Sequence, residues 1–266
     1  MKKIFLSADI EGTAGIVHWD ETETGKPLYD RFARQMTREV AAACQGAMAA
    51  GAGEILVKDA HDTGRNLDPE QLPPCARIFR GWGRDPYSMM GGLERDFDGV
   101  VFTGYHSAAD TDGNPLAHTM NLGIDRLTIN GETAPELLIN SLTAAYMGVP
   151  VRFVSGDEAL CRWMHRMCPG TVTVATNRGV GNGAVCLHPD EAVERIRAGV
   201  EEALYRPKAE CLFPLPEAFE VEVRYRQHFM AHRAGFYPGA RQTGPRTVAF
   251  RHNDYFQVLT FFAFVL

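Results

Sequence analysis

The chain contains 266 residues, of which 45% are hydrophobic and 23% are charged, and its formal net charge at pH 7 is −6. Such a composition is typical of a globular protein with enough apolar residues for a substantial core. Because the net charge is acidic and no basic cluster stands out, we expect neither nucleic acid nor a membrane surface as a partner. The apolar N-terminal run is interrupted at Asp9, which predicts that it is neither a signal peptide nor a membrane span.

The first predicted strand, around residues 4–6, leads directly to two carboxylates, Asp9 and Glu11, and then to a glycine-containing turn. In an extended strand, residues two apart project to the same face, so the two carboxylates should point together. Like charges held side by side repel each other unless a positive group lies between them, and a metal ion is the usual solution. A strand that ends in a polar turn is the alternative, and this stretch alone favours that alternative.

A helix is predicted over residues 29–50, where apolar residues recur at intervals of four. Further short strands are predicted at residues 54–58, 76–79 and 99–103, with a short helix around residues 87–93. Strands that alternate with helices in this way indicate an α/β fold, with a mainly parallel sheet between layers of helices.

Two histidines follow strands of this predicted sheet, because His61 comes after residues 54–58 and His106 after residues 99–103. In open parallel sheets, ligands bind outside the carboxyl ends of the strands. We therefore expect both histidines to meet the two N-terminal carboxylates at one edge of the sheet. A solvated turn histidine is the alternative explanation for each.

The second half of the chain begins with an expected hairpin at residues 127–133, whose turn is Asn-Gly. A helix is then predicted over residues 133–146, a strand over 149–154 and a second helix that ends at 167. A strand at 171–174 and a helix at 189–205 follow. The pattern changes at residues 219–223, where apolar and charged side chains alternate as in a half-exposed antiparallel strand. With a strand at 247–250 and a helix from 253, this segment indicates a smaller α+β unit. Because residues 177–183 are glycine-rich, we predict a catalytic metal-binding domain at 1–185 and a smaller domain at 186–266. The smaller domain is a candidate for oligomer contacts.

Several candidate residues have structural explanations as well as functional ones. Glu136 lies in Thr133-x-x-Glu136, which fits a capping box at a helix start, and alone this spacing favours the cap. His118 fits an ordinary loop histidine. Asp59 and Asp62 flank His61, and either could orient its ring.

Other common chemistries lack their motifs: there is no P-loop spacing, no G-x-S-x-G turn, no H-E-x-x-H pair and no G-x-G-x-x-G turn after the first strand. What remains is a mixed carboxylate and imidazole set, which suits zinc, with manganese or cobalt as substitutes. Five ligands exceed one closed tetrahedral site, whereas two metals bridged by a carboxylate would use them all. The set consists of Asp9, Glu11, His61, His106 and Glu136.

These motifs, in this order and spacing, resemble the zinc-dependent D-aminopeptidase family, whose founding member is encoded in a bacterial dipeptide-transport operon. The resemblance is strongest up to about residue 158 and continues more weakly to the C-terminus. One departure is Ala117, where the family often has serine, which puts in question how the next residue is oriented. The matching segments are Ser7-Ala8-Asp9-Ile10-Glu11-Gly12, Asp59-Ala60-His61, Gly104-Tyr105-His106, His118-Thr119-Met120, Glu136-Leu137 and Gly156-Asp157.

The resemblance implies that the five-residue set binds two zinc ions per subunit, with Asp9 as the bridge, and that His118 is catalytic. It also implies an aminopeptidase that releases an N-terminal D-amino acid, such as D-alanine, from short peptides. The family forms ring-shaped homo-oligomers, and a decamer is described for its founding member. Asp157 and Glu158 are candidates for holding the ammonium group of the substrate.

Two alternatives stay open at this stage. A dinuclear metal-dependent amidase or peptidase could act on L-peptides or on another amide. A non-catalytic protein could use the same pocket to capture peptides, although here every ligand position of the motif is filled. The six cysteines include no C-x-x-C pair, which favours reduced thiols in a cytoplasmic protein, and Cys44 lies on the apolar stripe of a helix as a core residue.

Overall fold

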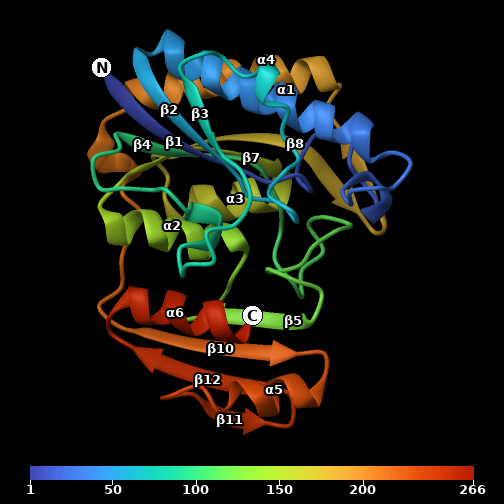
Figure 1. The fold of residues 1–266 in the computed structure, drawn as a ribbon, viewed down its shortest axis with the longest axis vertical. Coiled ribbons are helices and arrows are strands. Elements are labelled where there is room, and N and C mark those ends of the chain that lie inside the picture. Colours follow the sequence, from blue (N-terminus) through green and yellow to red (C-terminus); the bar gives the residue numbers. More distant parts are fainter.

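The computed structural model describes residues 1–266, which form two sheets with helices around and between them (Figure 1). The larger sheet has seven strands in the order β3-β2-β1-β4-β7-β8-β9, and all of its neighbours are parallel except the pair of β8 and β9. The strands are β1 (Lys2–Ala8), β2 (Ala52–Asp59), β3 (Ala76–Phe79), β4 (Gly99–Tyr105), β7 (Val151–Asp157), β8 (Val172–Val180) and β9 (Gly183–Cys186).

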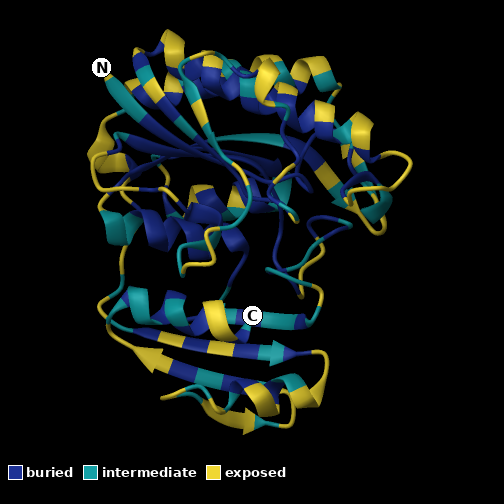
Figure 2. Ribbon diagram, viewed as in Figure 1, coloured by how far each residue is buried: buried dark blue, intermediate teal, exposed yellow.

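Helices cover both faces of this sheet, as the alternation of strands and helices predicts. Helices α1 (Tyr29–Ala49) and α4 (Pro189–Tyr205) pack together on one face, whereas α2 (Glu136–Met147) and α3 (Glu158–Met167) lie on the other (Figure 1). The inner strands are buried on both faces and the outward sides of the helices are exposed (Figure 2). The predicted α/β class is therefore confirmed.

The second sheet has five strands in the order β11-β12-β10-β5-β6 and is antiparallel throughout. Helix α6 (Tyr255–Val265) lies between this sheet and α2, and α5 (His228–Ala234) also packs against it (Figure 1). The strands are β5 (Ile124–Ile129), β6 (Glu132–Thr133), β10 (Phe219–Tyr225), β11 (Arg241–Gly244) and β12 (Thr247–His252).

The two sheets do not divide the chain at residues 185 and 186, where the sequence places the domain boundary. Helix α4 packs on α1 and on strands of the larger sheet, although it lies beyond that boundary. The predicted hairpin is present as β5 and β6, but it pairs with β10 and so belongs to the second sheet. A local pattern shows that a segment is a strand, whereas its partner is set by contacts with distant residues.

Two further expectations differ from the structure. The glycine-rich segment at 177–183 is not a linker, because β8 continues to Val180 and turns directly into β9. The short helix expected around residues 87–93 is only a 3-10 turn over Ser88–Met90. Both segments are short and rich in small residues, so periodicity gives little information there.

The apolar core consists of two clusters, one on each face of the larger sheet. The first lies beneath α1 and α4 and includes Cys44, as predicted from its helix stripe. The second packs α2 against the sheet and continues through Tyr255 and Phe261 of α6 into the five-stranded sheet. The apolar C-terminal segment is thus largely buried within one chain, and no helix is both long and apolar enough to cross a membrane.

The carboxyl ends of β1 and β4 approach each other so closely that glycine is required. Gly104 has a φ of +70°, and a Cβ added to it would lie 2.1 Å from the carbonyl oxygen of Asp9. A Cβ on Gly12 would lie 1.9 Å from the carbonyl oxygen of Tyr105, and the Gly12 amide donates to Gly104. These contacts fix the backbone that carries Asp9.

We expect Gly104→Ala to lower the free energy of unfolding by more than about 3 kcal/mol, because backbone strain and steric overlap add. Gly51→Ala is the matched control, since Gly51 has a φ of +89° but open space around its Cβ position. That control should cost only about 1 to 2 kcal/mol. Denaturant unfolding of both variants measures the difference, and equal losses would refute the role of the close contact.

Candidate metal centre

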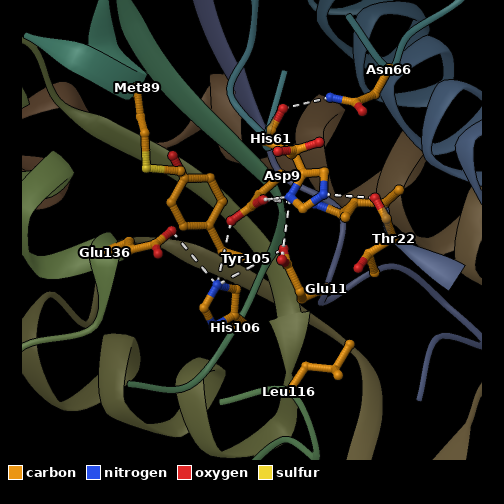
Figure 3. Close-up of polar contacts among 12 residues, drawn as sticks. Asp9, Glu11, Thr22, His61, Asn66, Met89, Tyr105, His106, Leu116 and Glu136 are labelled. Carbon is orange, nitrogen blue, oxygen red and sulfur yellow. Dashed lines mark hydrogen bonds and ion pairs between the residues drawn. The ribbon is translucent and has the colours of Figure 1, made fainter. Parts of the chain in front are cut away.

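The carboxyl ends of three adjacent strands bring the predicted residues together at one edge of the larger sheet (Figure 3). Asp9 and Glu11 follow β1, His61 follows β2 and His106 follows β4. Glu136, the first residue of α2, reaches the same place from the other side. All five side chains are buried, so their charges are largely removed from water.

The five residues form two groups that share Asp9. His61 Nδ1 lies 3.3 Å from Asp9 Oδ1 and 3.3 Å from Glu11 Oε1. His106 Nε2 lies 3.6 Å from Asp9 Oδ2 and 3.6 Å from Glu136 Oε2. Within each group, one potential ligand atom from every residue lies within 4.8 Å of the others. The two oxygens of Asp9 therefore face different histidines, as a bridging carboxylate requires.

Three atoms at the centre of this cluster have no hydrogen-bond partner although they are fully buried. They are Asp9 Oδ2, Glu11 Oε2 and His106 Nε2. Buried polar atoms are almost always paired, because an unpaired one loses its interactions with water without replacement. The three converge on one another, so a cation among them would satisfy all three. The residues present therefore fit a metal site.

Backbone carbonyls fix the histidine tautomers in the form that metal binding needs. His61 Nε2 lies 2.9 Å from the carbonyl oxygen of Thr22, and His106 Nδ1 lies 2.9 Å from that of Ser107 (Figure 3 shows the first contact). A carbonyl oxygen can only accept, so these ring nitrogens carry the hydrogens. The opposite nitrogens face the carboxylates and are the ones that a metal ion would bind in place of a proton, and such backbone contacts typically orient metal-bound histidines.

The structure does not support Asp59 or Asp62 as the residue that orients His61. Both oxygens of Asp59 accept hydrogen bonds from Asn66 and Leu67, which shapes the loop after β2. The carbonyl of Thr22 takes the orienting role instead. Backbone acceptors of this kind leave no residue-type signal, so the sequence could not identify it.

The capping explanation of Glu136 is wrong. The N-cap of α2 is Pro135, and no side chain caps this helix. Instead, Glu136 Oε1 accepts a hydrogen bond of 2.7 Å from the amide of Met120, and Oε2 faces His106. A capping glutamate turns back to its own helix, whereas this one is aimed at the cluster.

His118 lies at the rim of the cluster, on the loop that precedes β5. Its ring stacks on His106 with centroids 4.3 Å apart, and Nε2 lies 3.6 Å from Glu136 Oε1. His118 Nδ1 donates to the carbonyl of Leu116, so the side chain at Ala117 is not needed to orient the ring. Glu11, His106 and His118 also form a third group of potential ligands.

Asn114 connects the two loops that carry Glu11 and His118. Its amide nitrogen donates to the carbonyl of Glu11 at 3.2 Å, and its oxygen accepts from the amide of Leu116 at 2.8 Å. Since Leu116 in turn accepts from His118, the backbone of Glu11 and the ring of His118 are held in one network. Asparagine is common in loops, so its sequence context gave no indication of this role.

Electrostatics in the cluster are dominated by burial and by mutual contacts. Burial and the neighbouring Glu11 raise the pKa of Asp9 well above its ordinary value. Burial also opposes ionisation of Glu11 and Glu136, but the nearby imidazoles outweigh it, lowering the pKa of Glu11 strongly and that of Glu136 to about 2. These carboxylates thus require positive charge close by, from protonated imidazoles or from metal ions.

Neither candidate for the substrate ammonium lies in the cluster. Asp157 accepts hydrogen bonds from the amide and hydroxyl of Ser107 and from the amide of Leu160, so it caps α3 and anchors the loop after His106. Glu158 forms ion pairs with arginines at the surface. Asp157 therefore serves the start of α3 and the neighbouring loop, not the cluster.

Comparisons with known proteins decide which family has this fold and this site. The model of a family described as D-aminopeptidase matches residues 1–264. The chain belongs to the D-aminopeptidase family. A D-aminopeptidase of Bacillus subtilis (strain 168) is 32% identical to it over 255 residues, which span 95% of this chain and 92% of the relative.

The structural comparison includes the second sheet as well as the first. The chain is similar to the solved structure of the Zn-dependent D-aminopeptidase DppA from Bacillus subtilis, described as a self-compartmentalizing protease, with a TM-score of 0.90 and 30% sequence identity. The match covers 98% of this chain and 95% of DppA. The resemblance inferred from the sequence motifs is thereby confirmed.

A buried glutamate on α1 supports the loop that follows the two N-terminal carboxylates. Glu39 Oε1 accepts from the amide of Ala14 at 3.0 Å and from Gln35 at 3.1 Å, whereas Oε2 has no partner. Burial raises the pKa of Glu39 from 4.5 to about 7. The folded protein therefore holds a proton there that the unfolded chain releases above pH 4.5.

We expect Glu39→Gln to remove this source of pH dependence. Because the folded pKa of Glu39 is raised, its ionisation reduces stability as the pH rises from about 4.5 through about 7. The free energy of unfolding of the variant, relative to that of the wild type, should rise by about 2 to 3 kcal/mol between pH 5 and pH 8. Denaturant unfolding at both pH values provides the measurement, and a pH-independent difference would contradict the assignment.

Proposed function

We propose that this chain is a zinc-dependent aminopeptidase that releases the N-terminal residue, a D-amino acid such as D-alanine, from short peptides. We further propose that two zinc ions per subunit are held by the five-residue set, with Asp9 as the bridge. The proposal rests mainly on one observation: one oxygen of Asp9 faces His61, and the other oxygen faces His106. Family membership and the zinc dependence of DppA support the metal and the substrate class.

When bound, the zinc pair supplies an activated water and polarises the carbonyl of the scissile peptide bond. His118 is the residue that we propose as the proton carrier. Its Nδ1 hydrogen is directed at Leu116, which leaves the lone pair on Nε2. Burial and the nearby His106 lower the pKa of His118, so the ring is neutral near pH 7. Nε2 can then accept a proton and deliver it to the leaving amine.

The exposure of the cluster suits a small substrate. The side chains of four members, Asp9, Glu11, His106 and Glu136, are at most 5% exposed, whereas those of His61 and His118 are 9% and 12% exposed. We therefore expect a substrate to reach the centre past these two histidines, whose small exposure limits the access. Such narrow access supports short peptides as the substrates.

We propose that the chain assembles into a homo-oligomer, in the form of the ring-shaped decamer implied by the family resemblance. DppA is described as self-compartmentalizing, which supports assembly. Several large apolar side chains on α5 and α6 and in the turn after α5 are exposed, as at subunit contacts. They are Phe229, Phe236 and Phe264. The six cysteines are unpaired, which supports a reducing, cytoplasmic location.

We expect zinc-loaded protein to release free amino acid from D-Ala-D-Ala at least about tenfold faster than from L-Ala-L-Ala. A chelator should abolish the release, and added zinc should restore it. Chelator-sensitive release mainly from the L-peptide would keep the metallopeptidase and refute the D-preference. No release from either peptide would contradict peptidase activity and favour another amide as the substrate.

We expect zinc content to separate the bridging role of Asp9 from the proton-carrying role of His118. Asp9→Asn should lose both zinc ions, because Asp9 is the residue that contributes a ligand to each of the two groups. His118→Ala should keep about two ions while kcat falls by about 10² to 10⁴. Metal analysis after gel filtration measures both, with circular dichroism as the check on folding. A His118→Ala protein that keeps only one zinc would make His118 a ligand instead.

A further inference from the structure

The segment of residues 17–22 lies beside His61 and His118, the two least buried residues of the site. It follows the loop after β1 and contains a 3-10 turn over Trp19–Glu21. The carbonyl of Thr22 contacts His61, and the indole of Trp19 packs edge-on against His118, with centroids 5.3 Å apart and an interplanar angle of 68°. One short segment therefore lies beside both histidines at which the cluster is open.

The position of Trp19 is fixed by its own segment. Glu21 is buried, and its Oε2 accepts hydrogen bonds from the amides of Val17 at 2.7 Å and His18 at 3.0 Å. The hydroxyl of Thr22 donates to the carbonyl of Trp19 at 3.1 Å. These bonds fix the backbone of the turn, and the side chain of Trp19 packs against the apolar core beneath α1, so the indole is not carried on a free loop.

Trp19 also bounds the access to His118. One face of the His118 ring is covered by the ring of His106, which is stacked on it and nearly parallel, at an interplanar angle of 12°. The indole packs against the same ring and remains partly exposed to solvent. A substrate group that reaches Nε2 of His118 must therefore pass close to the indole.

We propose that Trp19 is a specificity-determining residue that forms the wall of the subsite for the second residue of the substrate. The inference rests on the proposed function, in which His118 protonates the leaving amine. That amine belongs to the second residue, so the side chain of this residue lies on the Trp19 side of the site. The rigid indole restricts this subsite to small side chains and provides an apolar surface against them.

The test compares dipeptides that differ at one position only. Wild-type, Trp19→Ala and Trp19→Phe proteins are assayed for kcat/KM on D-Ala-D-Ala, D-Ala-D-Leu and D-Leu-D-Ala. For Trp19→Ala, the ratio of D-Ala-D-Leu to D-Ala-D-Ala should rise by about tenfold or more, since a methylene in an apolar pocket changes selectivity by about 10 to 200-fold. The ratio of D-Leu-D-Ala to D-Ala-D-Ala should stay within about twofold, and Trp19→Phe should keep ratios close to the wild type.

Trp163→Ala is the matched control, because Trp163 is a partly buried tryptophan on α3 whose indole donates to Glu132. Its ratios should equal those of the wild type, and all variants should keep the wild-type zinc content. Unchanged ratios in Trp19→Ala, or an equal change at the first residue, would overturn the inference. Trp19→Leu replaces Trp19→Ala if the latter fails to fold, with the same expected direction. If the wild type cleaves none of the dipeptides, the proposed function itself is refuted. This result differs from failure of the Trp19 inference alone, in which the wild type is active and only the ratios stay unchanged.

Discussion

Three buried carboxylates facing one another are the constraint on which the rest of this structure depends. Asp9, Glu11 and Glu136 lie within one cluster, and each is removed from water. Burial opposes their ionisation, and their mutual repulsion adds to that cost. Positive charge placed among them offsets this cost, and His61 Nδ1 and His106 Nε2 face the same place. This geometry fits the metal centre that we propose, and backbone contacts support its histidines.

The fold provides this cluster through close packing of strand ends. Gly12 and Gly104 let the ends of β1 and β4 approach without side chains between them, so Asp9 and His106 face each other. Helix α2 then delivers Glu136 from the opposite side. The hairpin that enters the second sheet follows the loop of His118, so the smaller sheet anchors one end of that loop. Fold and site are thus parts of one arrangement.

The fold class and the clustering of the motif residues could be predicted from the sequence, because strand ends of a parallel sheet meet at one edge. Contacts between segments that are distant in the chain could not be predicted in this way. The pairing of β5 with β10 and the packing of α4 on α1 depend on contacts that no local pattern records. The contacts of Thr22 and Asn114 involve backbone groups, which carry no residue-type signal. Glu136 shows the reverse case, in which a capping motif was present but the side chain served the cluster.

The central claim is that Asp9 joins two metal ions, and anomalous scattering at the zinc absorption edge tests it most directly. Crystals of the zinc-loaded protein should show two peaks about 3.5 to 4 Å apart. One peak should lie about 2 Å from an Asp9 oxygen and His61, and the other about 2 Å from the second Asp9 oxygen and His106. A single peak, or two peaks of which only one contacts Asp9, would contradict the account.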